Sequence, residues 1–83
     1  MDKILVTVHV PVIEENYDFF LPINLPMSFI ANALQDSIAE LSNGAYKKKD
    51  RIVMFDSIDG KIINQNNIVK FSGLRNGSDI LII

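Results

Sequence analysis

Few side chains in this sequence belong to the types that catalyse reactions or bind metal ions. The chain has one histidine, His9, and no cysteine, so it lacks thiolate ligands, a cysteine nucleophile and a second imidazole. Two acidic pairs, Glu14-Glu15 and Asp56 with Asp59, fall in segments predicted to be turns. Nothing around them indicates the apolar pocket that acid–base catalysis by paired carboxylates requires. The sequence therefore predicts no enzyme, no metal site and no cofactor.

The basic and glycine-containing segments also lack a specific chemistry. The only basic run, Lys47-Lys48-Lys49, is typical of a solvated loop, with a weak docking site for an acidic partner as the alternative. The segments GKII (60–63) and NGSD (76–79) do not have the glycine spacing that cradles phosphate. A formal net charge of −2 argues against nucleic acid as a partner.

Length and composition indicate one globular domain that spans residues 1–83. Hydrophobic residues make up 48% of the chain, which is enough for a packed core. No apolar run approaches the roughly 18 residues of a membrane span, and the first ten residues lack the long apolar core and cleavage site of a signal peptide. We therefore expect a cytoplasmic protein without direct membrane insertion.

Alternating apolar residues predict a hairpin at the start of the chain. In KILVTVHV (3–10), Ile4 and Val6 share a face, which is the period of a strand with one buried side. After a turn, YDFFLPI (17–23) alternates in the same way, with Phe19 on its apolar face. We expect the two segments to pair as antiparallel strands.

From Met27 the apolar period becomes helical. The residues that form one stripe are Met27, Ile30, Ala31, Leu34, Ile38 and Leu41. Gln35 is predicted to lie outside this stripe. Ser28, Asn24 and the Pro26-Met27 step are alternative starting points for the helix, and the sequence does not decide between them.

The second half of the chain predicts three more strands. RIVMFDS (51–57) is expected to be the third, a short KII (61–63) the fourth, and 79–83 the last. Between the last two, Asn67 is expected to cap a single helical turn. The residues expected to close the bottom of the core from this turn are Ile68, Val69, Phe71 and Leu74.

This order of elements leaves little freedom of arrangement. One helix must cover the single apolar face of the sheet, and the last strand must return beside the first. The predicted fold is therefore α+β: a β-grasp, or ubiquitin-like fold, with a mixed sheet of four to five strands packed on one α-helix. The expected strand order is 2-1-5-3.

Three segments carry a resemblance to known families. RIVMF (51–55) resembles the third strand of ubiquitin-like proteins, and GLRNGSDILII (73–83) resembles their last turn and strand. The segment 6–30, together with LSNGAY (41–46), is similar to the YukD-like (EsaB-like) ubiquitin-like proteins of bacterial type VII (Esx-type) secretion loci. This resemblance covers nearly the whole chain.

Conjugation to other proteins is not expected of this chain. Ubiquitin-type modifiers and the sulfur carriers that share their fold act through a flexible tail that ends in Gly-Gly. This sequence ends in the aliphatic strand 79–83, and it has no internal Gly-Gly that trimming would expose. We therefore expect binding to be its function.

Two classes of function remain open. The resemblance implies a non-conjugated adaptor or regulator of type VII secretion, which binds a membrane component or the motor ATPase of that machine. The alternative is a diverged β-grasp subunit or regulator, related to sulfur carriers, in a biosynthetic pathway. An enzyme would need a pocket lined by titratable groups, for which the sequence supplies no constellation.

The predicted protein-binding surface is the face of the sheet that points away from the helix. If Val53 and Phe55 enter the core, Met54 points outward with Leu81 beside it, as in the apolar patch through which ubiquitin docks its receptors. The residues predicted for this surface are Leu5, Thr7, His9, Met54, Leu81 and Ile83. We expect a protein partner or a second copy of the chain to cover it.

Phe29 is a further candidate contact residue. It lies roughly 140° from the centre of the helical stripe, so at least half of its side chain should be exposed. It is either an anchor for a partner or a lid over the loop before the helix, and the nearby Pro22 and Pro26 favour the lid. The YukD-like pattern has a polar or acidic residue at this position.

Overall fold

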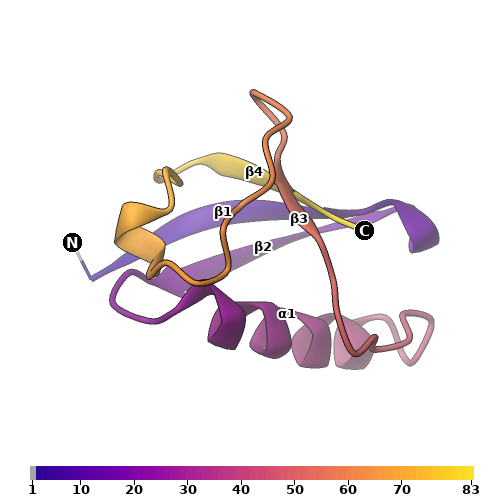
Figure 1. Ribbon diagram of the computed structural model, residues 1–83. Coiled ribbons are helices and arrows are strands. Elements are labelled where there is room, and N and C mark those ends of the chain that lie inside the picture. Colours follow the sequence, from indigo (N-terminus) through magenta and orange to yellow (C-terminus); the bar gives the residue numbers. More distant parts are fainter. Residues whose placement is uncertain (1) are drawn as a thin grey trace.

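The computed structural model describes residues 2–83 and contains one four-stranded sheet packed on one long helix (Figure 1). In chain order the elements are β1 (Lys3–Val10), a 3-10 turn η1 (Pro11–Ile13), β2 (Glu15–Pro22), α1 (Met27–Leu41), β3 (Met54–Asp56), a second 3-10 turn η2 (Val69–Phe71) and β4 (Ser78–Ile82). The strands lie in the order β2-β1-β4-β3. β1 is antiparallel to β2 and parallel to β4, and β3 is antiparallel to β4. This is the predicted β-grasp.

The register of the hairpin follows from its alternating sequence. Val6 lies opposite Phe19 and Val8 opposite Tyr17, and the side chains of β1 alternate between buried and half-exposed. A shift of one residue would move the whole valine row into water, so the alternation specifies the register strongly. The predicted faces of both strands are confirmed.

Backbone groups, and no side chain, cap the start of α1. The helix begins at Met27 after Pro26, whose side chain has no hydrogen to donate or lone pair to offer. The N–H of Met27 donates to the carbonyl of Asn67 at 2.8 Å, and that of Ser28 donates to Gln65 at 3.0 Å. A segment some forty residues away thus satisfies the first donors of the helix, which local sequence patterns do not reveal.

The two ends of the predicted helical stripe differ in burial. Met27 is fully buried, as predicted, whereas Leu41 at the C-terminus is 59% exposed, so its prediction as a core residue is wrong. The helix runs past the edge of the core in its last turn. Gln35, predicted to lie outside the stripe, is only 1% exposed.

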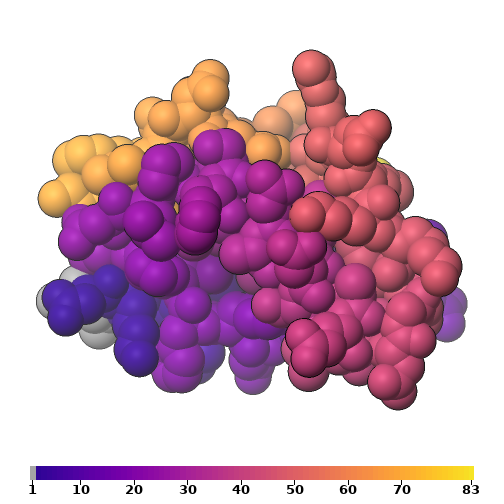
Figure 2. Space-filling view, turned by 90° about the horizontal axis from the view of Figure 1, so that it is seen from below, coloured from indigo at the N-terminus to yellow at the C-terminus, as the bar shows by residue number. Residues whose placement is uncertain are grey.

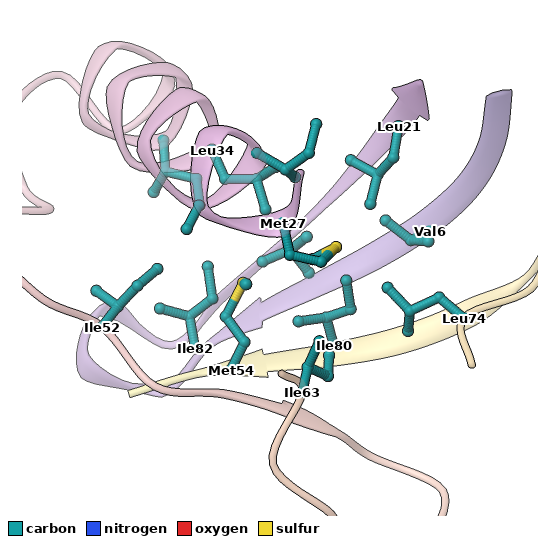
Figure 3. Close-up of a cluster of buried hydrophobic side chains, with 14 of the residues drawn as sticks. Val6, Leu21, Met27, Leu34, Ile52, Met54, Ile63, Leu74, Ile80 and Ile82 are labelled. Carbon is teal, nitrogen blue, oxygen red and sulfur yellow. The ribbon is translucent and has the colours of Figure 1, made fainter. Parts of the chain in front are cut away.

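The predicted register of the third strand is wrong by one residue. Met54 is 0% exposed and lies opposite Ile82 of β4, with both side chains under the helix (Figure 3), whereas Val53 is 41% exposed. Met54 is therefore a core residue and not a contact residue of the outward face. The run Ile52 to Phe55 is apolar at every position, so it lacks the alternation that reveals a register. Pairing with β4 decides it.

The segment between β3 and β4 departs from the prediction in three details. KII (61–63) does not form a strand; Ile62 makes an isolated bridge with Phe55, and Ile63 is buried in the core. Asn67 makes no side-chain cap, and η2 begins at Val69. Phe71 is 68% exposed and not part of the core, which is filled from this segment by Ile63, Val69 and Leu74.

Candidate protein-binding face

Four apolar side chains line the β3–β4 side of the sheet, on the face that the helix leaves uncovered. We call them the outer strip; its members are Val53, Phe55, Leu81 and Ile83. Phe55 lies directly opposite Leu81 in the antiparallel pair. The backbones of Val53 and Ile83 exchange two hydrogen bonds, at 3.0 and 2.9 Å. Because residues opposite one another in a pair share a face, the four side chains are neighbours.

The four side chains of the outer strip are partly exposed to solvent, so a partner can contact them. Val53 and Ile83 are 41% and 57% exposed, and Phe55 and Leu81 are half-buried. A cavity of about 400 Å³ lies next to Leu81, and its other lining residues include Pro11, Glu14 and Glu15. The site therefore offers apolar contact area together with a recess that has carboxylates at its rim.

A polar network occupies the middle of the same face. The His9 Nε2 lies 2.9 Å from the Asp79 Oδ1, and the His9 Nδ1 lies 2.8 Å from the Asn16 Oδ1. The Thr7 hydroxyl donates to the Asp18 carboxylate at 2.8 Å. The His9 ring thus lies between the Asp79 carboxylate and the Asn16 amide, with one of these groups at each ring nitrogen. These bonds orient His9 and fix the edge of the outer strip.

The polar network divides the predicted surface into two parts. Leu81 and Ile83 belong to the outer strip, and half-buried His9 borders it. Thr7 lies within the network and Leu5 beyond it, where Leu5 pairs with Phe20 of β2. The outward orientation predicted for these five residues is confirmed, but they do not form one apolar patch.

Phe29 lies on the helix side of the molecule, away from the outer strip. It is 57% exposed, which confirms the predicted exposure, and it lines a groove with Pro22 and Leu25. The structure therefore does not bring it together with the outward-facing candidates.

Val53 and Phe55 were not predicted as binding residues, yet they hold the outward positions that Met54 was expected to take. Phe20 was not among the predicted residues either; it is 61% exposed at the other end of the sheet, with the Lys3 ammonium 4.8 Å from its ring centre. The alternation of β2 does place Phe20 outward. No pattern within residues 52–55 identifies the outward pair in β3.

Gln35 holds the segment that leads into the outer strip. Its Nε2 donates to the Lys49 carbonyl at 3.0 Å, and its Oε1 accepts from the Lys49 N–H at 2.7 Å and from the Tyr46 hydroxyl at 2.8 Å. Burial raises the pKa of the Tyr46 hydroxyl above its ordinary value. Helix α1 is thus tied to the loop before β3 through a buried amide whose nitrogen and oxygen both have hydrogen-bond partners.

Three further observations concern the basic run, metal ligands and the helices. The three lysines of the basic run are exposed, and the Lys48 ammonium lies 2.9 Å from the Asp36 carboxylate. Within residues 2–83 no group of three or more potential metal-ligating side chains comes together. None of the helices described there has both the length and the apolar character that crossing a membrane demands.

Solved structures that resemble the chain include ubiquitin-like domains. The ubiquitin-like domain of the Mycobacterium tuberculosis type VII secretion system protein ECCD1 has a TM-score of 0.76 at 13% identity, over 100% of this chain and 99% of that one. The N-terminal ubiquitin-like domain of the 4931431F19Rik protein has a TM-score of 0.69 at 23% identity, over 99% and 74%. A chain of the MycP5-free ESX-5 inner membrane complex has a TM-score of 0.72 at 15% identity, over 100% of this chain and 21% of that one.

These likenesses show that the chain has the ubiquitin-like β-grasp fold. No protein-family model and no curated protein matches the sequence. At identities of 23% or less, the likenesses establish the fold and leave the similarity to YukD-like proteins as a prediction.

Proposed function

We propose that this chain is a non-conjugated ubiquitin-like adaptor that acts in the bacterial cytoplasm, in type VII secretion, by binding a protein component of the secretion machine through the outer strip. The observation that carries the proposal is the contiguous row of four apolar side chains on the helix-free face of the sheet. On a small acidic domain, a row of this kind is more often covered by a binding partner than left exposed to solvent. Its chemistry is that of docking and not of catalysis.

The surroundings of the outer strip indicate what kind of partner it fits. The cavity beside Leu81 accepts an apolar side chain, and Glu14 and Glu15 at its rim favour a basic residue next to that side chain. The neighbouring polar network offers the Asp79 carboxylate, which is 43% exposed, as a further acceptor. We therefore expect a partner surface with an apolar anchor flanked by lysine or arginine.

The link to secretion rests on the comparisons. The ECCD1 domain comes from a type VII secretion system protein and the other chain from the ESX-5 inner membrane complex, and each covers the whole of this chain. A small ubiquitin-like chain with an exposed apolar row suits a cytoplasmic contact with a membrane component or the motor ATPase of such an assembly.

Affinity purification from the native cells tests this function. The chain is used as bait in three forms: the parent, Leu81→Asp, and the matched control Leu41→Asp, which makes the same change at an exposed position on the helix side. The parent and the control should retain a membrane component or ATPase of the secretion machine, and Leu81→Asp should lose it. Retention of enzymes of a biosynthetic pathway instead would support the sulfur-carrier relative, and equal retention by all three forms would contradict the assignment to the outer strip.

A further inference from the structure

The outer edge of β2 presents backbone groups that no strand within residues 2–83 pairs with. The N–H of Leu5 donates to the Asn76 Oδ1 and its carbonyl accepts from the Gly77 N–H, so Leu5 turns both groups toward β4. Its antiparallel partner Phe20 must then turn its own N–H and carbonyl away from β1, and Asp18, two residues earlier, does the same. Both groups of both residues point to the open edge.

The opposite edge of the sheet is covered. The N–H of Ile63 donates to the Met54 carbonyl at 2.8 Å, and the N–H of Asp56 donates to Lys61 at 2.9 Å. The segment 61–63 thus occupies the outer side of β3. Within residues 2–83, β2 is therefore the edge at which the sheet can be extended, and open edges of this kind readily pair with a further strand.

An apolar groove runs along this edge on the helix side, between β2 and α1, where the two elements lie next to each other in Figure 2. Its volume is about 200 Å³, and no charged side chain lines it. Phe29 stands at the end near Pro22, and the small residues Ala33 and Ser37 follow along the helix. The groove therefore has a bulky aromatic end and a shallow end.

On the face of the sheet away from the helix, the charges near the β2 edge are self-complementary. The Lys3 ammonium lies 4.8 Å from the ring centre of Phe20, and Asp18 lies on the same outward face two residues before Phe20. If β2 pairs antiparallel with a second β2 about Phe19, Asp18 of each copy faces Phe20 of the other. Asp18 then lies beside Lys3 of the second copy, and the twofold axis creates this pair twice.

We propose that two copies of the chain associate through β2, as antiparallel edge strands related by a twofold axis at Phe19, so that their four-stranded sheets become one. Asp18 and Phe20 of opposite copies exchange backbone hydrogen bonds. The two Phe19 side chains meet at the axis on the helix side, and Phe29 of each copy faces the Ala33–Ser37 end of the other groove. In this arrangement the backbone groups, the charges and the shapes of the two β2 edges are complementary.

This dimer leaves the outer strip free, because the strip lies on the β3–β4 side of the sheet and the contact lies at β2. The inference is thus separate from the proposed adaptor function. A dimer would present two outer strips, and so would bind a multimeric partner with an avidity that a single copy lacks.

Sedimentation equilibrium from micromolar to millimolar concentration tests the proposal with charge-reversal variants. The parent should form a dimer, and Asp18→Lys or Lys3→Asp should each weaken it by about tenfold or more, because both pairs in the dimer become repulsive. The double variant, which restores opposite charges, should recover most of the parent's association. A monomeric parent at all concentrations, or a double variant as weak as the single ones, would overturn the proposal.

Amide hydrogen exchange measured at low and high protein concentration locates the contact. The amides of Asp18 and Phe20 should exchange at least about tenfold more slowly in the dimer, because they become paired. The Val53 amide, already bonded to Ile83, is the control and should not change. Association without added protection at Asp18 and Phe20 would show that the copies meet elsewhere and would refute pairing through β2.

Discussion

Phe55 and Leu81 lie directly opposite each other across the β3–β4 pair, on the face of the sheet that α1 leaves uncovered. Met54, which precedes Phe55, and Ile82, which follows Leu81, are also opposite each other, and both are buried. One pairing therefore fixes both the core and the binding surface, and substitutions at adjacent positions should have opposite consequences.

Leu81→Asp should leave the protein folded and remove partner binding. The side chain points away from the core, so its replacement costs little stability, whereas a charge at the centre of an apolar contact should weaken it by about 2 kcal/mol or more. Binding titration and circular dichroism measure the two effects. Folded Leu81→Asp that binds as tightly as the parent would contradict the role of the outer strip.

Met54→Asp should unfold the protein. Met54 is 0% exposed among apolar side chains, and a carboxylate there would have no partner, at a cost of about 4 kcal/mol or more. The adjacent Val53→Asp, at a position 41% exposed, serves as the control and should cost about 1 kcal/mol or less. Thermal unfolding of the two variants compares them, and the reverse order of stability would mean that the register of β3 is other than described.

Gln35→Ala should destabilise the fold by about 2 kcal/mol or more. The truncation leaves the Lys49 N–H and carbonyl and the Tyr46 hydroxyl without their buried partner. Asn32→Ala, at an exposed position one turn earlier, is the matched control and should be neutral or slightly stabilising. Urea unfolding gives both free energies. Equal stability of the two variants would indicate that the loop is held by other contacts.

Stability should fall above pH 10, with Tyr46 as one cause. Because burial raises the Tyr46 pKa, the unfolded chain loses this proton first, so folding stability is constant below about pH 10 and declines as the pH rises toward the folded-state pKa. In a Tyr17→Phe background, absorbance at alkaline pH reports Tyr46 alone, since the chain has two tyrosines. Titration of folded Tyr46 at or below pH 10 would contradict its burial.

The hairpin shows how much of the fold the sequence specifies locally. In β1 every second residue is apolar and the residues between them are mostly polar, so a wrong register would expose a whole row of valines. Helix α1 is equally clear from its period. These two elements, with the last strand, leave the β-grasp as the arrangement that buries one face, and the strand order could be predicted from them.

The binding surface could be predicted only in part, because two of its determinants are not local. Residues 52–55 are all apolar, so their faces are decided by pairing with β4 and not by their own pattern. The bond between His9 and Asp79 joins residues far apart in the chain and depends on the parallel β1–β4 register. Likewise, Gln35 is buried because Lys49 and Tyr46 bond to it, and a polar residue at the margin of a helical stripe gives no sign of such partners.

Photo-crosslinking in the native cells tests the central claim most directly. A photoreactive phenylalanine analogue is placed at Phe55 in the outer strip or, as a control, at the exposed Leu41 on the helix side. The account predicts a crosslink to a component of the secretion machine from position 55, lost when Leu81→Asp is added, and none from position 41. A crosslink to that component from position 41 but not from position 55 would contradict the account.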